Sequence, residues 1–453
     1  MKPLANVEFD GRPPARLLYF GLCLYLLSQA YLIPLVAIGP SWTLWPTLTD
    51  LATVLLGLML LLNWQELRLP SVLNQRTLVL LYILVAGCLL YYAGYLAFVN
   101  KEVGATNGGY AIFRLVQFVV VYWIVIHIPL DEPRIRTLRR IVDLTLIITC
   151  AGIALTYFGT IPLSQVVAHL PQGFESAGPW YRYTQLDRLG YEGIGWGFVS
   201  YNHAYVAIQP FTLLVLRMHL SGQKRSATHT LFLALVIVAC FLTNSRTGFA
   251  GSVLFALLYW IRKPLGLALG VLFATSVVLA LLVFMPSISS ISAQTDTVMK
   301  SLQRQSTVVN LEESENLSGR TDIWLDRLTR AFGAPWRGWI GGGFGSARDS
   351  GSIAHNVYLH VFFETGIFGL LFMLFLFAHI LFFLYRTESS PRPLFWGTAV
   401  LLFTSFTNDY FYPMPFNGHF IGLYLCAIGI ALATPAAVVA EQEGARTQCL
   451  GNT

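Results

Sequence analysis

The chain has 453 residues and a formal net charge of +6; 55% of its residues are hydrophobic and only 11% are charged. Soluble domains carry about 25% charged residues, so this composition excludes a set of soluble domains. Apolar runs of about 20 residues recur along the chain, as membrane-spanning helices require. Because barrel strands would alternate apolar and polar residues instead, the sequence predicts an all-α polytopic membrane protein.

We expect about twelve transmembrane helices in a single polytopic domain over residues 1–453. The seventh and eighth spans are short for a full crossing, so we expect them to be tilted or to break where they meet. The expected spans cover residues 15–38, 43–63, 77–99, 108–127, 137–158, 197–217, 229–244, 247–261, 265–284, 356–385, 392–408 and 417–436.

The distribution of Lys and Arg predicts the orientation. If the N-terminus is cytoplasmic, each cytoplasmic loop carries at least two Lys or Arg, whereas the short external loops around 39–42, 100–107 and 409–416 hold only Lys101. This asymmetry follows the positive-inside rule. We therefore expect both termini inside and two large loops, 159–196 and 285–355, outside. The positive charge then reflects topology and phospholipid contact, and no nucleic-acid partner is expected.

Two arginines stand out on the external side. Arg246, in "LTNSRTGFAG", lies in a very short loop where positive charge is normally avoided, so it needs an anionic partner unless it anchors lipid headgroups. Arg320 opens "RTDIWLDRLTRAFG", whose apolar face predicts a helix lying in the membrane interface. A basic residue in the first turn opposes the helix dipole. Arg320 is therefore expected beside an anion, unless it is an ordinary surface arginine.

The tenth span begins with "HNVYLHVFFETGIFGL". His355 and Asn356 fall at its external end, where the positive end of the helix dipole disfavours an imidazolium and leaves a neutral ring able to accept a proton. The alternative is a capping or interfacial histidine. Glu364 lies within the span, where a carboxylate must find a partner.

Further polar groups occur in the other external loops. Asp409 lies among aromatic residues in "TNDYFYPMPFNGH", and Arg182 and Arg188 lie in the first large loop beside several aromatic residues. Aromatic rings with scattered polar groups suit the binding of sugars, although they equally suit a membrane interface. The external "GGGFGS" at 341–346 predicts a flexible turn rather than a phosphate-binding loop, because no nucleotide pool exists outside.

Fixed arginines, a histidine and a carboxylate at headgroup level predict a lipid-borne anion as ligand. Arginine matches phosphate oxygens in pairs, and a diphosphate leaving group needs its charge neutralised. Because the external loops show no set of metal ligands, we expect arginines to take that role without a metal or other cofactor. A neutral histidine would then deprotonate an attacking hydroxyl.

Three ordered segments, "NSRTG" at 244–248, "SGRTDIW" at 318–324 and "HNVYLHVFFETGIFGL" at 355–370, resemble the O-antigen ligase and polymerase superfamily. Members are bacterial membrane glycosyltransferases that use undecaprenyl-diphosphate-linked glycans. The resemblance implies a GT-C-like fold in the inner membrane with a periplasmic active site. It also implies that Arg246 and Arg320 hold the donor diphosphate and that His355 is essential for transfer. In the family's ligases a Gly-Leu pair follows the histidine motif, whereas this chain has Gly366–Ile367.

The resemblance leaves the acceptor open. The favoured function is polymerisation of O-antigen or exopolysaccharide repeat units, because the segment from Arg320 to His355 is compact. The alternatives are a ligase that transfers the glycan to a lipid A-core acceptor, a protein O-oligosaccharyltransferase and, in a different class, a glycolipid transporter. Asn356, Asp409, Arg182, Arg188 and Glu364 are expected to support the site or bind the acceptor. Membrane lipids and a chain-length regulator are further candidate partners.

Overall fold

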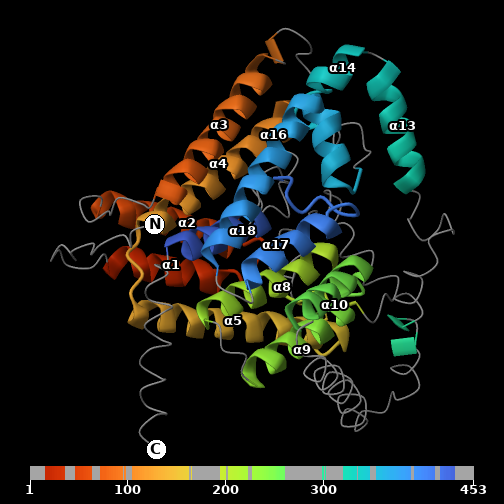
Figure 1. The fold of residues 1–453 in the computed structure, drawn as a ribbon. Helices are drawn as coiled ribbons and strands as arrows, with labels where there is room; N and C mark the ends of the chain where they lie inside the picture. The colour runs from red at the N-terminus through yellow and green to blue at the C-terminus, as the bar shows by residue number, and fades with distance from the viewer. Residues whose placement is uncertain are drawn as a thin grey trace, which may run out of the picture.

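The computed structural model describes most of the chain, and its regular elements in this part are helices joined by turns (Figure 1). The all-α prediction is therefore confirmed for the described residues. These residues are 16–35, 46–63, 72–94, 96–97, 105–162, 165, 194–199, 203–222, 227–260, 298–299, 301–302, 320–333, 335–346, 354–388, 392–413 and 419–433. The helices are α1 (Arg16–Ser28), α2 (Leu48–Leu62), α3 (Val72–Gly94), α4 (Ala105–His127), α5 (Glu132–Tyr157), α8 (His203–Leu220), α9 (Ala227–Leu242), α10 (Arg246–Trp260), α13 (Arg320–Gly333), α14 (Pro335–Ile340), α16 (Val357–Thr387), α17 (Pro393–Thr404) and α18 (His419–Ala433).

Eleven of the twelve expected spans overlap a described helix, and the ninth, at 265–284, lies outside the described residues. Within the described part of the chain, three stretches are long and apolar enough to cross a membrane: Asn74–Gly94, Gly108–His127 and Val357–Thr387. Several other helices are apolar but shorter. The helices indicate a membrane protein, while the number of crossings stays a prediction.

The ends of the helices have local causes. The first expected span is helical only to Ser28, whose hydroxyl donates to the carbonyl oxygen of Tyr25 at 2.7 Å. The chain then runs to Pro34, which forms an isolated bridge with Thr47 just before α2. The seventh and eighth spans break where they meet, as expected. The break falls at Asn244, whose φ of 57° cannot continue a helix.

Helix ends that are expected outside contact one another. The amide of Leu32 donates to Phe198 at 2.7 Å, and the amide of Gly195 donates to Leu242 at 2.8 Å. At the opposite ends, the Tyr19 hydroxyl of α1 donates to the backbone oxygen of Arg134 in α5 at 2.8 Å. This packing agrees with the expected alternation of helix directions.

Helix α18 lies at the centre of the described helices, between α4 and α8 (Figure 1). Its residues from His419 to Leu432 are buried. A Cβ atom added at Gly422 would lie 2.5 Å from the Tyr25 hydroxyl and 2.8 Å from the Phe118 ring. Small residues permit such close helix packing in membranes.

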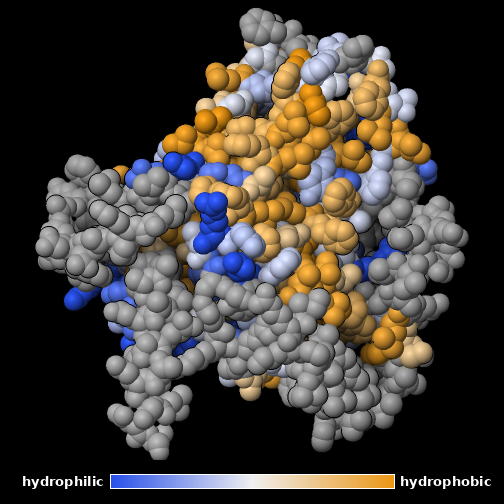
Figure 2. All heavy atoms as spheres, viewed as in Figure 1, coloured by the Kyte–Doolittle hydropathy of each residue, from blue (hydrophilic) through white to orange (hydrophobic). Residues whose placement is uncertain are grey.

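The periphery is apolar. Leu61 of α2, Leu90 of α3 and Phe368 of α16 are 72%, 75% and 61% exposed, and Figure 2 shows a broad apolar surface over α16 and its neighbours. A soluble protein rarely exposes so much contiguous apolar surface. Lipid is the solvent that suits it.

Candidate functional site

Three segments meet at the end of the bundle that is expected to be external: the start of α10, the turn 405–413 and the start of α16. The hydroxyl oxygens of Thr247 and Thr407 lie 2.9 Å apart. The amide of Val357 donates to the carbonyl oxygens of Ser405 and Asn408 at 3.1 and 3.2 Å. Arg246, half-buried, is the first residue of α10 and therefore stands beside this junction.

His355 is exposed over 41% of its side chain, and its Nδ1 lies 3.9 Å from Oδ2 of the buried Asp409. Its φ of 50° is uncommon for a residue with a side chain, and such backbone strain concentrates at functional sites. The turn brings the imidazole out of the helix and toward Asp409.

The expected position of His355 needs a correction. Asn356, not His355, is the N-cap of α16, and its side-chain oxygen accepts from the amides of Tyr358 and Leu359 at 3.0 and 3.1 Å. His355 therefore precedes the helix, where the helix dipole weakens rapidly. The Asp409 carboxylate, 3.9 Å away, attracts an imidazolium at this position.

Below His355 lies a buried cluster, which we name the His360 cluster: His360, Glu364, Asp409 and Tyr412. His360 Nε2 lies 3.3 Å from Glu364 Oε1, and His360 Nδ1 lies 3.5 Å from Asp409 Oδ1. The Tyr412 ring stacks on the imidazole with centroids 3.8 Å apart, and its hydroxyl donates to Glu364. Burial and the Glu364 carboxylate raise the pKa of Tyr412 well above its usual range, which keeps it a donor.

Helix α16 breaks at Gly366, where φ is 68° and ψ is −167°. The carbonyl oxygens near the break accept hydrogen bonds from the glycine-rich turn 341–346. Gly342 donates to Phe363 at 2.7 Å, and Gly343 donates to Glu364 at 3.0 Å. The amide of Gly345 also donates to the Glu364 carboxylate at 3.0 Å. This turn was expected to be flexible, but in the structure it closes the break in α16.

The close approach explains why glycine occupies the turn and the break. A Cβ atom on Gly366 would lie 2.1 Å from the Trp339 carbonyl oxygen, and one on Gly341 would lie 2.3 Å from the Glu364 carbonyl. Both glycines have positive φ, which other residues rarely adopt. The position of Glu364 is therefore fixed by backbone as well as side-chain contacts.

Helix α13 packs beside the same segment. The indole nitrogen of Trp324 donates to the carbonyl oxygen of Ala354 at 2.6 Å, next to His355. The buried guanidinium of Arg327 lies 4.1 Å from the ring centroid of Phe363. Burial and the nearby Arg330 lower the pKa of Arg327, although a guanidinium stays charged in proteins.

The side chains of three expected arginines lie outside the described part of the structure. Arg182 and Arg188 lie outside the described residues. Arg320 begins α13, one helical turn before Trp324, but its side chain lies outside what the structure describes.

An apolar groove of about 340 Å³ extends from the His360 cluster between α3, α16 and α18. Its lining includes Gly87, Phe344, Thr365, Ile380, Tyr412 and Leu425. Nine residues of α16 between Val361 and Ile380 line it, on both sides of the break at Gly366. The groove thus follows α16 along much of its length.

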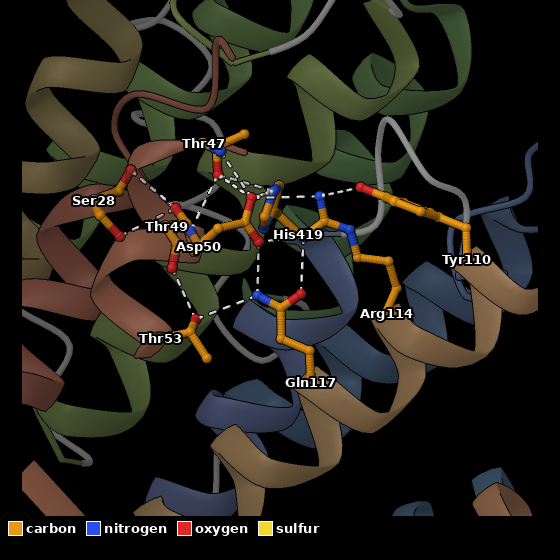
Figure 3. Close-up of polar contacts among 9 residues, drawn as sticks. All are labelled: Ser28, Thr47, Thr49, Asp50, Thr53, Tyr110, Arg114, Gln117 and His419. Carbon is orange, nitrogen blue, oxygen red and sulfur yellow. Dashed lines mark hydrogen bonds and ion pairs between the residues drawn. The ribbon is translucent and has the colours of Figure 1, made fainter. Parts of the chain in front are cut away.

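A second buried polar cluster joins α2, α4 and α18 (Figure 3). The Arg114 guanidinium donates to the Asp50 carboxylate and, at 3.0 Å, to the Tyr110 hydroxyl. Gln117 also donates to Asp50 at 2.8 Å, and His419 Nε2 lies 3.5 Å from Asp50. These contacts fix the start of α18, which follows the segment that carries Asp409.

The structure brings together four predicted site residues: His355, Asn356, Glu364 and Asp409. Arg246 is adjacent through Thr247. Among the residues described here, no group of three or more His, Cys, Asp or Glu side chains has the arrangement of a metal site.

Sequence reasoning missed His360 and Tyr412. One signal was present for His360, because His360 and Glu364 are four residues apart and therefore share a helix face. Nothing in the sequence marked Tyr412, which belongs to a series of interfacial aromatic residues.

The geometry is that of a polar site at one end of an apolar helical bundle. Residues 231–374 match a protein-family model described as O-Antigen ligase. The matched region contains Arg246, Arg320, His355 and Glu364, so the resemblance to the O-antigen ligase and polymerase superfamily is confirmed there. The match supports a function of the ligase or polymerase type. No curated protein matches the chain.

Proposed function

We propose that the protein is an inner-membrane glycosyltransferase that transfers an undecaprenyl-diphosphate-linked glycan to a sugar hydroxyl on the periplasmic face. The observation that carries this proposal is the pairing of His355 with Asp409 at the external end of the bundle, within a region that matches the O-antigen ligase model. The accessible imidazole stands where a lipid-linked donor and a sugar acceptor could both reach it.

The proposed reaction is a direct displacement. The acceptor hydroxyl oxygen attacks the anomeric carbon of the donor glycan, and the bond from that carbon to the diphosphate oxygen breaks. His355 accepts the hydroxyl proton, and Asp409 stabilises the imidazolium that forms. Arg246 and Arg320 bind the diphosphate and neutralise the charge that develops on it as it leaves. We expect this mechanism to need no metal ion.

The apolar groove supports a lipid-linked donor. It begins at Thr365 and Tyr412, beside the His360 cluster, and is lined almost entirely by apolar side chains. A long isoprenoid chain can lie along α16 in this groove while its diphosphate reaches the external site. A water-soluble nucleotide sugar would need no such groove.

Polymerisation of O-antigen or exopolysaccharide repeat units is the favoured reaction. It is supported by the short stretch between α13 and α16, which leaves little protein for a large second acceptor. Ligation to lipid A-core is the main alternative, since the family model carries the ligase description. Transfer to a protein and transport of a glycolipid are further alternatives.

Deletion of the gene followed by gel analysis of the surface glycan tests the proposal. A polymerase deletion leaves core with one repeat unit, whereas a ligase deletion leaves bare core and polymer retained on its lipid carrier. Loss of all glycan from the periplasmic face would instead support a transporter. Cysteine labelling adds a topological control, because cytoplasmic accessibility near residues 246 and 355 would contradict the glycosyltransferase.

A further inference from the structure

We propose that His360 is a positioning residue that holds the Asp409 carboxylate beside His355 and shares the charge of that carboxylate. This inference rests on the proposed function, because it takes His355 as the group that accepts the acceptor proton. It concerns a residue that does not reach the external surface and therefore acts through its neighbour.

The first observation is the placement of His360 between two carboxylates. Its Nδ1 lies 3.5 Å from Oδ1 of Asp409, and its Nε2 lies 3.3 Å from Oε1 of Glu364. The other oxygen of Asp409, Oδ2, is the one that lies 3.9 Å from His355. A single carboxylate thus stands between a buried and an accessible imidazole.

The second observation is the rigidity of the support. His360 is only 1% exposed and is covered by the Tyr412 ring, stacked at 3.8 Å and 18°. Its partner Glu364 is held by the Gly345 amide and the Tyr412 hydroxyl. The carbonyl oxygen of Asp409 accepts from the Tyr205 hydroxyl of α8 at 2.9 Å. Each group around His360 is therefore fixed from a second element of the fold.

The arrangement also balances the charges of the two carboxylates, Asp409 and Glu364. Two carboxylates buried together are unfavourable unless a positive group lies between them, and His360 is the titratable group that lies within 3.5 Å of both. A positive His360 also limits how strongly Asp409 attracts a proton on His355. In the described part of the chain, the titratable groups around the cluster include Tyr91 and Cys88 of α3, Arg327 of α13 and Tyr205 of α8.

The test uses His360→Gln, which keeps a polar side chain but removes the charge. The full-length protein in lipid nanodiscs is treated with diethyl pyrocarbonate at a series of pH values, and modification of His355 is measured by mass spectrometry. Without a positive charge at residue 360, Asp409 attracts the His355 proton more strongly. The midpoint for His355 modification should therefore move to higher pH. His379→Gln, on the same helix and outside the cluster, should leave the midpoint unchanged.

Turnover provides the second readout. His360→Gln should lower kcat about ten- to a hundredfold, the range found when groups that orient metal-bound histidines are removed, with the donor KM nearly unchanged. In a His355→Ala background the same change should have almost no further effect, because residues that act as one unit are not additive.

The outcomes separate the two proposals. An unchanged or lowered His355 midpoint in His360→Gln would overturn the positioning role, as would multiplicative losses in the double variant. A fully active His355→Ala would overturn the base in the proposed function instead. The labelling measurement needs no activity, so it tests the positioning role even then. His360→Asn serves as a second charge-free variant if His360→Gln fails to fold.

Discussion

The hydroxyl oxygens of Thr247 and Thr407 lie 2.9 Å apart, although the two residues are 160 positions apart in the sequence. Thr247 follows Arg246 directly, and Thr407 lies two residues before Asp409. The contact therefore fixes the arginine proposed to bind the diphosphate relative to the carboxylate that faces His355. Displacement of either segment would separate the two functional groups.

Arg246→Lys should lose activity although it keeps the charge, because an ammonium cannot contact two phosphate oxygens in a fork. We expect transition-state stabilisation to fall by at least about 1–3 kcal/mol, the range for a charge-assisted hydrogen bond. The measurement is kcat/KM in proteoliposomes with a lipid-linked donor. Arg330→Lys is the control, since Arg330 is exposed and pairs with Asp326 on α13. Full activity of Arg246→Lys would mean that Arg246 anchors lipid headgroups.

His355→Ala should abolish most turnover while the protein stays folded and binds its donor. General-base catalysis contributes about 10²–10⁴-fold, so kcat should fall within that range. Donor affinity should remain, because the arginines bind the diphosphate. A donor-binding assay and a single-turnover assay distinguish the two effects. His127→Ala, on α4 away from the site, is the control. Loss of donor binding would identify His355 as a diphosphate ligand instead.

Gly366→Ala should destabilise the fold. Its φ of 68° is unfavourable for alanine, and the added Cβ would lie 2.1 Å from the Trp339 carbonyl oxygen. This backbone conformation is essentially restricted to glycine and costs another residue about 1–3 kcal/mol, and the clash adds to that. Thermal unfolding in detergent measures the change. Gly57→Ala has open space around its Cβ and should be neutral or stabilising. Equal Tm values for both variants would contradict the tight break in α16.

Gly87→Phe should obstruct the apolar groove without distorting α3, because an added Cβ meets no atom within 4 Å. We expect the KM for a donor with a long isoprenoid tail to rise about tenfold, equivalent to about 1.4 kcal/mol. A donor with a short tail should be unaffected. The control is Gly57→Phe, another open glycine position that does not line the groove. Equal losses with both tails would argue against the groove as the tail site.

Arg114→Met should destabilise the protein by about 3–5 kcal/mol, because it leaves the Asp50 carboxylate buried without its cation. The Arg114 side chain is only 2% exposed and that of Asp50 is 16% exposed. Arg136→Met removes a cation from an ion pair that is more than half exposed on Arg136 and should change stability by less than about 1 kcal/mol. Denaturation in detergent compares the two. Similar stabilities of the two variants would mean that the buried polar cluster around Asp50 does not stabilise the packing of α18.

The helices were largely predictable because apolar runs determine them. The residues at which the helices end were harder to predict. The first helix ends at Ser28, ten residues before the predicted end of the span, and the chain then forms the bridge from Pro34 to Thr47. The break at Gly366 was also missed, since a glycine in an apolar run does not reveal which backbone will pack against it.

The candidate site was predictable where a polar residue stands out against apolar sequence, as Arg246, His355, Glu364 and Asp409 do. Their mutual arrangement was not. The role proposed for His360 depends on its contact with Asp409, which is 49 residues away in sequence. The role of Tyr412 depends on its hydrogen bond to Glu364. Such contacts depend on how α16 and the turn 405–413 pack, and no local spacing records that packing.

The partners of Glu364 also set an order of assembly. Gly345 precedes it in the chain, whereas Tyr412 follows it by 48 residues. During synthesis, the carboxylate therefore enters the bilayer after two of its partners, His360 and the amide of Gly345, have been made. Its tyrosine and the Asp409 that faces His360 arrive with the final hairpin. A chain truncated after α16 would carry a buried acid and imidazole without these partners, so quality-control proteases could distinguish unfinished from finished protein at this point.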